Sequence, residues 1–168
     1  PFAAGSDATA AQLTRLNDAA PALALTDQTG REVTLESSRG RPVIVAFAFA
    51  HCETVCPLVV ADVMTARRRL GPEAPPALIV TLDPWRDTPS RLASIARQWG
   101  LDADAHVLSG APDEVERTLN RWRVPRVRNE KTGDISHPSI VYVIGANGRI
   151  AYVVSGNADA ISAAVRAL

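Results

Sequence analysis

The sequence VIVAFAFAHCETVCPLVV, residues 43–60, joins an apolar run to a pair of cysteines. The run from Val43 to Ala50 begins with β-branched residues and has the length of a strand, and its uniform apolarity favours a strand buried on both faces. Pro57 follows the second cysteine and can occupy the first turn of a helix, which we expect to run to about Leu70. The stretch therefore predicts a buried strand, a cysteine-bearing loop and a helix.

Length and composition describe a chain that can form one domain. It has 168 residues, of which 46% are hydrophobic, with 18 basic and 18 acidic side chains. This length is typical of a single domain with its own core. The charges cancel and form no basic stripe, so no nucleic-acid partner is expected. The longest apolar run is about ten residues, which is too short to cross a bilayer.

Upstream of the run, residues 22–35 alternate apolar and polar side chains around the turn sequence DQTG, which predicts a β-hairpin. Residues 1–20 are rich in alanine and weakly patterned. We expect them to form a loose or helical N-terminal extension, and residues 21–168 to form one domain.

Downstream, strand and helix patterns alternate. Residues 77–83 form a second buried strand, and the segment after it has Thr88 as a helix N-cap and Gly100 as its stop. The remaining elements are expected to be a helix over 111–122, a hairpin around the GANG sequence at 145–148, and a helix over 158–167. This order predicts an α/β, thioredoxin-like fold, with a central mixed sheet flanked by helices and an added N-terminal β-hairpin.

Cys52 and Cys56 follow the first parallel strand, where sites form in open α/β sheets. A purely structural disulfide would close a small ring worth only about 2 kcal/mol. On one helix the two Cβ atoms would be about 5–6 Å apart, whereas a disulfide prefers about 3.5–4.5 Å, so such a bond should be reducible. Thiolates near a helix N-terminus can instead exchange with another disulfide or hold a soft metal such as Cu(I).

Three histidines could supply a further metal ligand. His51 adjoins Cys52 but would point the other way in an extended segment. His106 is most simply a surface or core side chain. His137 begins the third core strand, which should lie beside the strand that carries the cysteines. Spacing alone leaves open whether His137 is a ligand or a polar group with a structural partner.

Three segments together resemble the Sco (SenC) family of copper-binding, thioredoxin-like proteins that assist cytochrome c oxidase assembly. They are LTDQTGREVTLESSRGRPVIVAFAFAHCETVCP, TLDPWRDTPSRL and HPSIVYVIGANGRI, and they occur in the family's order over residues 25–150. The resemblance implies that Cys52, Cys56 and His137 form a Cys2His copper site. Asp83 matches the family's acidic residue near the site, which implies a role in orienting a ligand or recognising a partner. Its structural alternative is a turn residue before Pro84.

The resemblance implies a metallochaperone that binds Cu(I) and Cu(II) and delivers copper to a client such as the copper A site of cytochrome c oxidase. The expected partners are an oxidase subunit or another copper-receiving protein, together with a thiol reductant or copper donor. A periplasmic or extracytoplasmic location is expected, with membrane contact only through a tether of the full-length protein that lies outside the given chain. The alternative is a thiol-disulfide oxidoreductase in which Cys52 and Cys56 are catalytic, and copper or redox sensing is a third role.

The chain departs from the family pattern near the expected ligands. Ser136 and Pro138 flank His137, where the family usually has Asp and Ser, and His51 before Cys52 offers an alternative ligand. In the second segment we expect Arg86 and Asp87 to stabilise their loop by pairing with each other. Trp85 is expected either to pack or to be exposed for contact with a partner.

Overall fold

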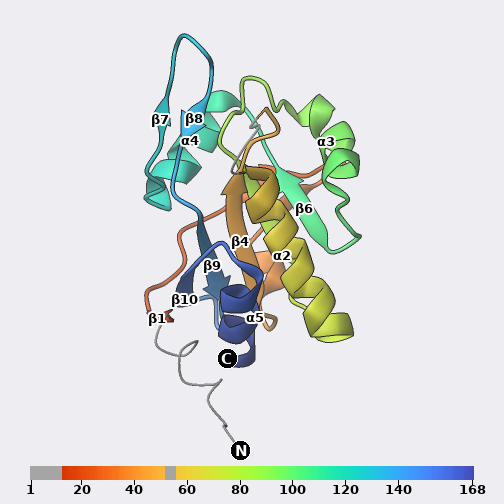
Figure 1. The fold of residues 1–168 in the computed structure, drawn as a ribbon, viewed down its shortest axis with the longest axis vertical. Coiled ribbons are helices and arrows are strands. Elements are labelled where there is room, and N and C mark those ends of the chain that lie inside the picture. The colour runs from red at the N-terminus through yellow and green to blue at the C-terminus, as the bar shows by residue number, and fades with distance from the viewer. Residues whose placement is uncertain (1–12, 52–55) are drawn as a thin grey trace, which may run out of the picture.

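The computed structural model describes residues 13–51 and 56–168 of the chain (Figure 1). Its strands are β1 (Thr14–Arg15), β2 (Ala24–Thr26), β3 (Glu32–Thr34), β4 (Val43–Ala48), β5 (Ala77–Thr81), β6 (Ala105–Leu108), β7 (Val127–Arg128), β8 (Ile135–Ser136), β9 (Ile140–Ile144) and β10 (Ile150–Ser155). Its helices are α2 (Cys56–Leu70), α3 (Leu92–Trp99), α4 (Pro112–Arg121) and α5 (Ala158–Arg166), with the short 3-10 helices η1 (Glu36–Ser38), η2 (Gly71–Glu73) and η3 (Pro89–Arg91). All four predicted helices and all three predicted core strands are present.

Six strands form the central sheet, in the order β1-β10-β9-β4-β5-β6. β4, β5 and β6 run parallel to one another, whereas β9 runs antiparallel to β4 and pairs Val141 with Ala46. The first residues of β9 therefore lie beside the carboxyl end of β4. This confirms the expectation that the strand after His137 is a neighbour of the strand leading to the cysteines, and it confirms a mixed sheet flanked by helices.

Apolar side chains on both faces of the sheet make the core. Every residue of β4 and β5 is buried, which explains why these strands are uniformly apolar rather than alternating. α2 and α5 pack on one face, where the Tyr152 hydroxyl donates a hydrogen bond to the Ala167 carbonyl (Figure 1). On the other face Phe47 packs edge-on against Trp122 and Tyr142, at ring-centroid distances of 6.1 and 6.0 Å.

The predicted N-terminal hairpin is present as β2 and β3. In its turn, the Asp27 carboxylate accepts hydrogen bonds from the backbone N–H groups of Thr29 and Arg31. Thr26 and Ser109 exchange two backbone hydrogen bonds, of 2.9 and 3.0 Å. These bonds attach the hairpin to the chain just beyond β6.

The N-terminal segment contributes to the sheet within its described part. Thr14 and Arg15 form β1, which pairs antiparallel with Val153 and Tyr152 of β10. Residues 14–15 of the expected extension are thus an edge strand and not a helix. Residues 1–12 lie outside the described residues.

Two features were absent from the predicted order of elements. The first is β6, a third parallel strand between α3 and α4, whose four residues include His106. The second is the two-stranded hairpin of β7 and β8 within residues 126–136. Figure 1 shows this hairpin at the same end of the sheet as the carboxyl end of β4.

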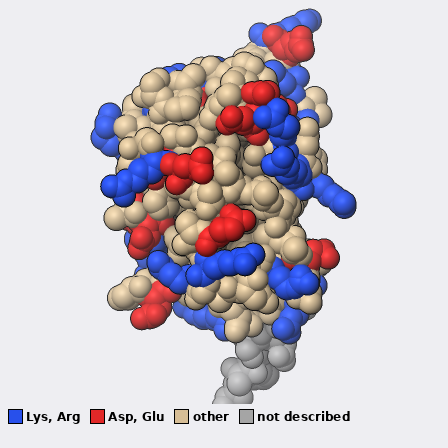
Figure 2. Space-filling model, turned by 180° about the vertical axis from the view of Figure 1, so that it is seen from behind, with Lys and Arg blue, Asp and Glu red and all other residues tan. Residues whose placement is uncertain are grey.

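Basic and acidic side chains are interspersed with uncharged ones over the face of the molecule shown in Figure 2. This distribution agrees with the equal numbers of basic and acidic residues in the sequence. Among the described residues, no helix combines the length and apolarity that crossing a bilayer requires.

Candidate metal centre

The structure describes the chain on both sides of the cysteine pair. Residues 52–55, which include Cys52, lie outside the described residues, and of Cys56 the structure describes only its place in the backbone. Before the pair, β4 ends at Ala48 and is followed by Phe49 and Ala50. After it, α2 begins at Cys56.

The start of α2 is a favourable place for negative charge. The first turn of a helix has N–H groups without intrahelical partners, and these lie at the positive end of the helix dipole. The first turn of α2 contains no acidic residue, whereas its last turn contains Arg67, Arg68 and Arg69. A thiolate at the first position of this helix would therefore be stabilised by the backbone without competition from a neighbouring carboxylate of the same turn.

His137 lies against the strand end that leads to the cysteines. It follows β8 and precedes β9, and its ring packs edge-on against the ring of Phe49, with centroids 6.0 Å apart and an interplanar angle of 66°. Phe49 is buried and stands three residues before Cys52. The fold thus brings the histidine to the upstream flank of the pair.

The segment after His137 also meets the downstream flank. Gly156, at the end of β10, donates its N–H to the Ser139 carbonyl at 2.9 Å. A Cβ on Gly156 would stand 2.4 Å from the Ser139 hydroxyl oxygen and 3.4 Å from a methyl group of Val59. Ser139 and Val59 therefore converge on the same glycine. Since Val59 is three residues after Cys56, the histidine segment lies beside the first turns of α2.

The surroundings of His137 favour the neutral form of its imidazole ring. Its Nδ1 lies 3.1 Å from the Pro138 carbonyl oxygen, which can only accept, so in this contact Nδ1 carries the hydrogen. Burial lowers the pKa of His137 below its ordinary value. In the neutral ring Nε2 then has the lone pair, which is the form in which imidazole binds metals.

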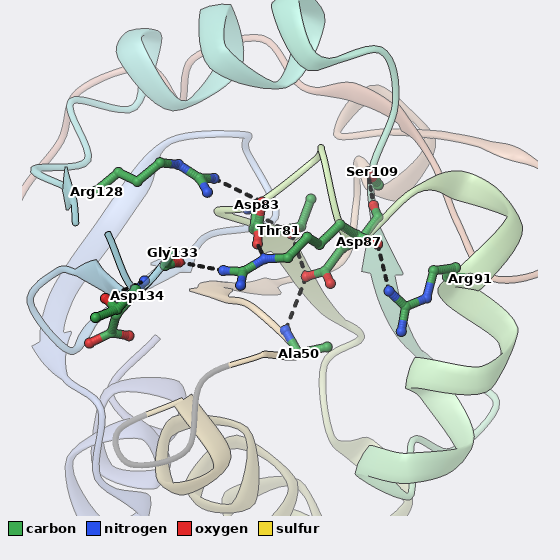
Figure 3. A network of polar contacts seen from close by, with 11 residues as sticks. Ala50, Thr81, Asp83, Asp87, Arg91, Ser109, Arg128, Gly133 and Asp134 are labelled. Carbon is green, nitrogen blue, oxygen red and sulfur yellow. Dashed lines mark hydrogen bonds and ion pairs between the residues drawn. The ribbon is translucent and has the colours of Figure 1, made fainter. Parts of the chain in front are cut away.

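Asp83 lies two residues after β5 and is fully buried, and two arginines neutralise it. Arg86 donates from Nε to one carboxylate oxygen, and Arg128 of β7 donates from Nη2 to the other at 2.8 Å. Arg128 also lies over the ring of Trp85, 4.6 Å from its centroid, and Trp85 is half exposed. Asp83 is therefore more than a turn residue, because it joins the β5 loop to the β7–β8 hairpin (Figure 3).

The expected pairing of Arg86 with Asp87 is wrong. Arg86 instead pairs with Asp83, and it also donates to the Gly133 carbonyl of the hairpin turn. Asp87 is buried and its carboxylate accepts hydrogen bonds from the Ala50 N–H at 3.0 Å and the Thr81 hydroxyl at 2.8 Å. Burial raises the pKa of Asp87 above its ordinary value.

The other two histidines differ in their surroundings. His106, in β6, has its Nδ1 3.0 Å from a carboxylate oxygen of Asp27, so its role is to join the N-terminal hairpin to the sheet. His51 is exposed at the start of the cysteine segment. Within the described side chains, which include neither Cys52 nor Cys56, no group of three or more His, Cys, Asp or Glu residues is arranged to hold a metal ion.

Sequence reasoning missed the groups that hold His137 in place. Phe49 looked like one more apolar residue of the strand, and nothing in the sequence relates it to a residue 88 positions later. The β7–β8 hairpin did have a local signal, since Val127 and Ile135 flank a polar stretch of turn-forming residues. In that turn the Asn129 side chain accepts from two backbone N–H groups, and Gly133 has a φ of 74°.

Comparison with known proteins gives a consistent result. The family model described as SCO1/SenC matches residues 11–167. The SCO1 protein homolog of Bacillus subtilis is 29% identical over 129 residues, which cover 74% of this chain and 67% of the relative. Several other curated relatives are longer still, and the chain spans about half of their length.

Solved structures have the same fold. ScoI of Bradyrhizobium japonicum, solved with copper bound, is 27% identical, with a TM-score of 0.71 over 90% of this chain and 99% of that one. BsSco, described as a Sco family cytochrome c oxidase assembly protein with a disulfide switch, is 25% identical, with a TM-score of 0.76 over 92% of this chain and 95% of that one. The thioredoxin-like fold predicted from the sequence is thereby confirmed.

Proposed function

The chain belongs to the SCO1/SenC family, and we propose that it is a copper-binding metallochaperone whose ligands are Cys52, Cys56 and His137. The observation that carries this proposal is the packing of His137 against Phe49, three residues before Cys52. Ser139 and Val59 both lie next to Gly156, so the segment that carries the imidazole is also near the chain that follows Cys56. The copper bound to a ScoI relative supports the choice of metal.

The three side chains suit copper in both oxidation states. Soft thiolates select Cu(I), and an added imidazole nitrogen extends the site to Cu(II). Burial lowers the pKa of His137 below its ordinary value, which favours the neutral ring that binds a metal ion. A site of three protein ligands can pass its ion on by stepwise ligand exchange.

We further propose that the ion is delivered to a copper-receiving protein, such as a cytochrome c oxidase subunit with a copper A site, outside the cytoplasm. The names of the Sco relatives support the link to oxidase assembly. Three of the exposed large apolar side chains belong to segments at this end of the sheet: Leu58, Trp85 and Val127. Their exposure suits contact with a protein partner. In an oxidising compartment the thiols would also need a thiol reductant.

The test is copper binding by the reduced protein, measured as stoichiometry and affinity for Cu(I) and as the electronic spectrum with Cu(II). The wild type should bind one ion of either state. Cys52→Ala and Cys56→Ala should lose both, whereas His137→Ala should lose Cu(II) binding and keep most Cu(I) binding. His51→Ala is the matched control, because that histidine adjoins Cys52 and is exposed. A Cu(II) spectrum that depends on His51 and not on His137 would reassign the third ligand.

Thiol-disulfide exchange is the second candidate, and the disulfide switch described for BsSco favours it. In that case Cys52 and Cys56 cycle between dithiol and disulfide, and a client disulfide is reduced as theirs forms. His137→Ala separates the two functions. It should leave the exchange rate with a peptide disulfide near that of the wild type, and it should weaken Cu(II) binding strongly. A dithiol that exchanges no faster than a free cysteine would remove this candidate.

A further inference from the structure

One short turn, residues 83–87, contacts both chain segments that lead to the proposed ligands. The turn is compact, because Asp83 accepts backbone hydrogen bonds from Arg86 at 3.2 Å and Asp87 at 2.8 Å. It follows β5 and contributes no ligand to the proposed site. Figure 3 shows that two side chains of the turn extend in different directions, Asp87 toward Ala50 and Asp83 toward Arg128.

On the cysteine side, Asp87 holds the chain just after β4. Its carboxylate accepts the Ala50 N–H at 3.0 Å and the Thr81 hydroxyl at 2.8 Å, and its own carbonyl accepts the Ser109 hydroxyl at 2.6 Å. Ala50 is two residues before Cys52. The turn therefore fixes the position of Ala50, at which the chain passes from β4 to the segment that contains the cysteines.

On the histidine side, Arg86 holds the β7–β8 hairpin. Its Nε donates to Asp83 and its Nη2 donates to the Gly133 carbonyl in the hairpin turn. Arg128 of β7 donates to the same carboxylate, so the hairpin is attached at its first strand and at its turn. The hairpin ends at Ser136, directly before His137.

We propose that Arg86 is a positioning residue for the metal site, one that sets where the His137 hairpin lies relative to the strand end leading to the cysteines. It does so without contacting the ion. The proposal rests on the proposed function, in which His137 is the ligand that Cu(II) requires.

The chemistry of the side chain explains why an arginine stands here. A planar guanidinium presents donors in fixed and different directions, so one group can bind a carboxylate and a carbonyl at once. A lysine ammonium is a single point charge on a flexible stem and cannot reproduce both bonds in this geometry. Asp83 is fully buried, so it needs its ionic partners, but Arg128 remains to neutralise it if Arg86 is replaced.

A displaced hairpin should affect the two copper states unequally. Two thiolates suffice to hold Cu(I), whereas Cu(II) depends on the imidazole. Residues that orient metal ligands typically change metal affinity by about 10- to 100-fold when they are replaced. Loss of Arg86 should therefore weaken Cu(II) binding by about tenfold or more and leave Cu(I) affinity within about threefold of the wild type.

The experiment compares Arg86→Met with Arg117→Met. Arg117 makes an exposed ion pair with Asp113 on α4, so its replacement controls for the loss of an arginine and of a salt bridge. Amide hydrogen exchange of residues 127–136 is measured without metal, and Cu(II) and Cu(I) affinities are measured with it. In Arg86→Met the amides of residues 127–136 should exchange faster than in the wild type, and Cu(II) affinity should fall while Cu(I) affinity stays nearly unchanged. Arg117→Met should show neither change. Arg86→Lys should also raise the exchange rate in the hairpin and lower Cu(II) affinity. It replaces Arg86→Met in the experiment if the methionine variant does not fold.

The outcomes separate this proposal from the function on which it rests. If His137→Ala loses Cu(II) affinity while Arg86→Met keeps wild-type affinity or wild-type exchange, the positioning role is overturned and the function stands. If His137→Ala keeps its Cu(II) affinity, the assignment of the ligand is overturned, and the proposal falls with it. Equal losses of Cu(I) and Cu(II) in Arg86→Met would also overturn the proposal, because they indicate general destabilisation.

Discussion

The imidazole ring of His137 lies edge-on against the buried ring of Phe49, 6.0 Å between centroids. This contact joins two segments that are 88 residues apart in the sequence. It depends on the antiparallel pairing of β9 with β4, which brings the start of one strand beside the end of the other. The position of the proposed third ligand therefore depends on the sheet and on this aromatic side chain, as well as on the hairpin that Arg86 attaches.

Replacing Phe49 by leucine should weaken Cu(II) binding, because it removes the ring that supports His137. Phe47→Leu is the matched control: Phe47 is also buried and aromatic, but it packs against Trp122 and Tyr142. Both variants remove a buried ring and leave a small cavity, so both should lose about 1–2 kcal/mol of stability in urea unfolding. Only Phe49→Leu should lower Cu(II) affinity. Equal Cu(II) affinities in the two variants would contradict a supporting role for Phe49.

Gly133→Ala tests the bond between Arg86 and the hairpin by changing the residue that accepts it, Gly133. Gly133 has a φ of 74°, and a Cβ there would stand 2.9 Å from Nη1 of Arg86. The guanidinium must then move away from its two acceptors. Gly30→Ala is the control, since Gly30 has a φ of 82° and open space around its Cβ position. Both variants incur backbone strain.

Only Gly133→Ala should raise amide exchange within residues 127–136 and lower Cu(II) affinity. The measurements are hydrogen exchange without metal and a Cu(II) titration of each variant. If Gly30→Ala reproduces both changes, they arise from backbone strain in general and not from displacement of Arg86.

Much of the fold could be predicted because the main elements carry local signals. The apolar run from Val43 specified a buried strand, and Gly100 ended α3 in the left-handed conformation, with a φ of 64°, as a helix stop does. β6 was missed because it has four residues, one of them a histidine, which is too short and too mixed for a periodicity signal. Its identity as a strand comes from pairing with β5, which is a tertiary interaction.

In the candidate site, too, some parts have local sequence signals and others depend on tertiary contacts. The end of β4 and the start of α2 could be predicted from residues 43–60 alone. The surroundings of His137, Arg86 and Asp87 could not, because each is determined by contacts between segments far apart in the sequence. The incorrect pairing of Arg86 with Asp87 illustrates this. Adjacent opposite charges suggested that these two side chains would pair, but Asp87 accepts from the Ala50 N–H, and Arg86 donates to Asp83 and to the distant Gly133 carbonyl.

Copper binding should stabilise the folded protein against unfolding, and more so as the free copper concentration rises relative to its Kd. A ligand that binds only the folded state adds about 2.7 kcal/mol at a free concentration 100 times its Kd. Cu(I) at that excess should raise the Tm of the reduced wild type and of His137→Ala, but not that of Cys52→Ala or Cys56→Ala. Thermal unfolding followed by circular dichroism, with and without Cu(I), gives the comparison. A Tm increase that persists in both cysteine variants would locate the stabilising ion elsewhere.

Asp87 should make stability depend on pH. Burial, with a further contribution from the nearby Asp83 charge, raises the pKa of Asp87 above its ordinary value of 3.8, although hydrogen bonds from Ala50 and Thr81 and the charge of Arg91 act in the other direction. A raised folded-state pKa means that the folded protein holds this proton more tightly than the unfolded chain does. The stability that follows is fully present below the unfolded pKa and is lost as the pH rises through the folded one.

Asp87→Asn removes that loss, because the amide oxygen can still accept both hydrogen bonds and the side chain cannot ionise. The free energy of unfolding of Asp87→Asn relative to the wild type should therefore rise as the pH increases from about 3 to about 7. Asp113→Asn, at an exposed position, serves as the control. Urea unfolding across this range measures the difference for each variant. A flat difference for Asp87→Asn would mean that the buried carboxylate ionises as readily in the folded protein as in the unfolded chain.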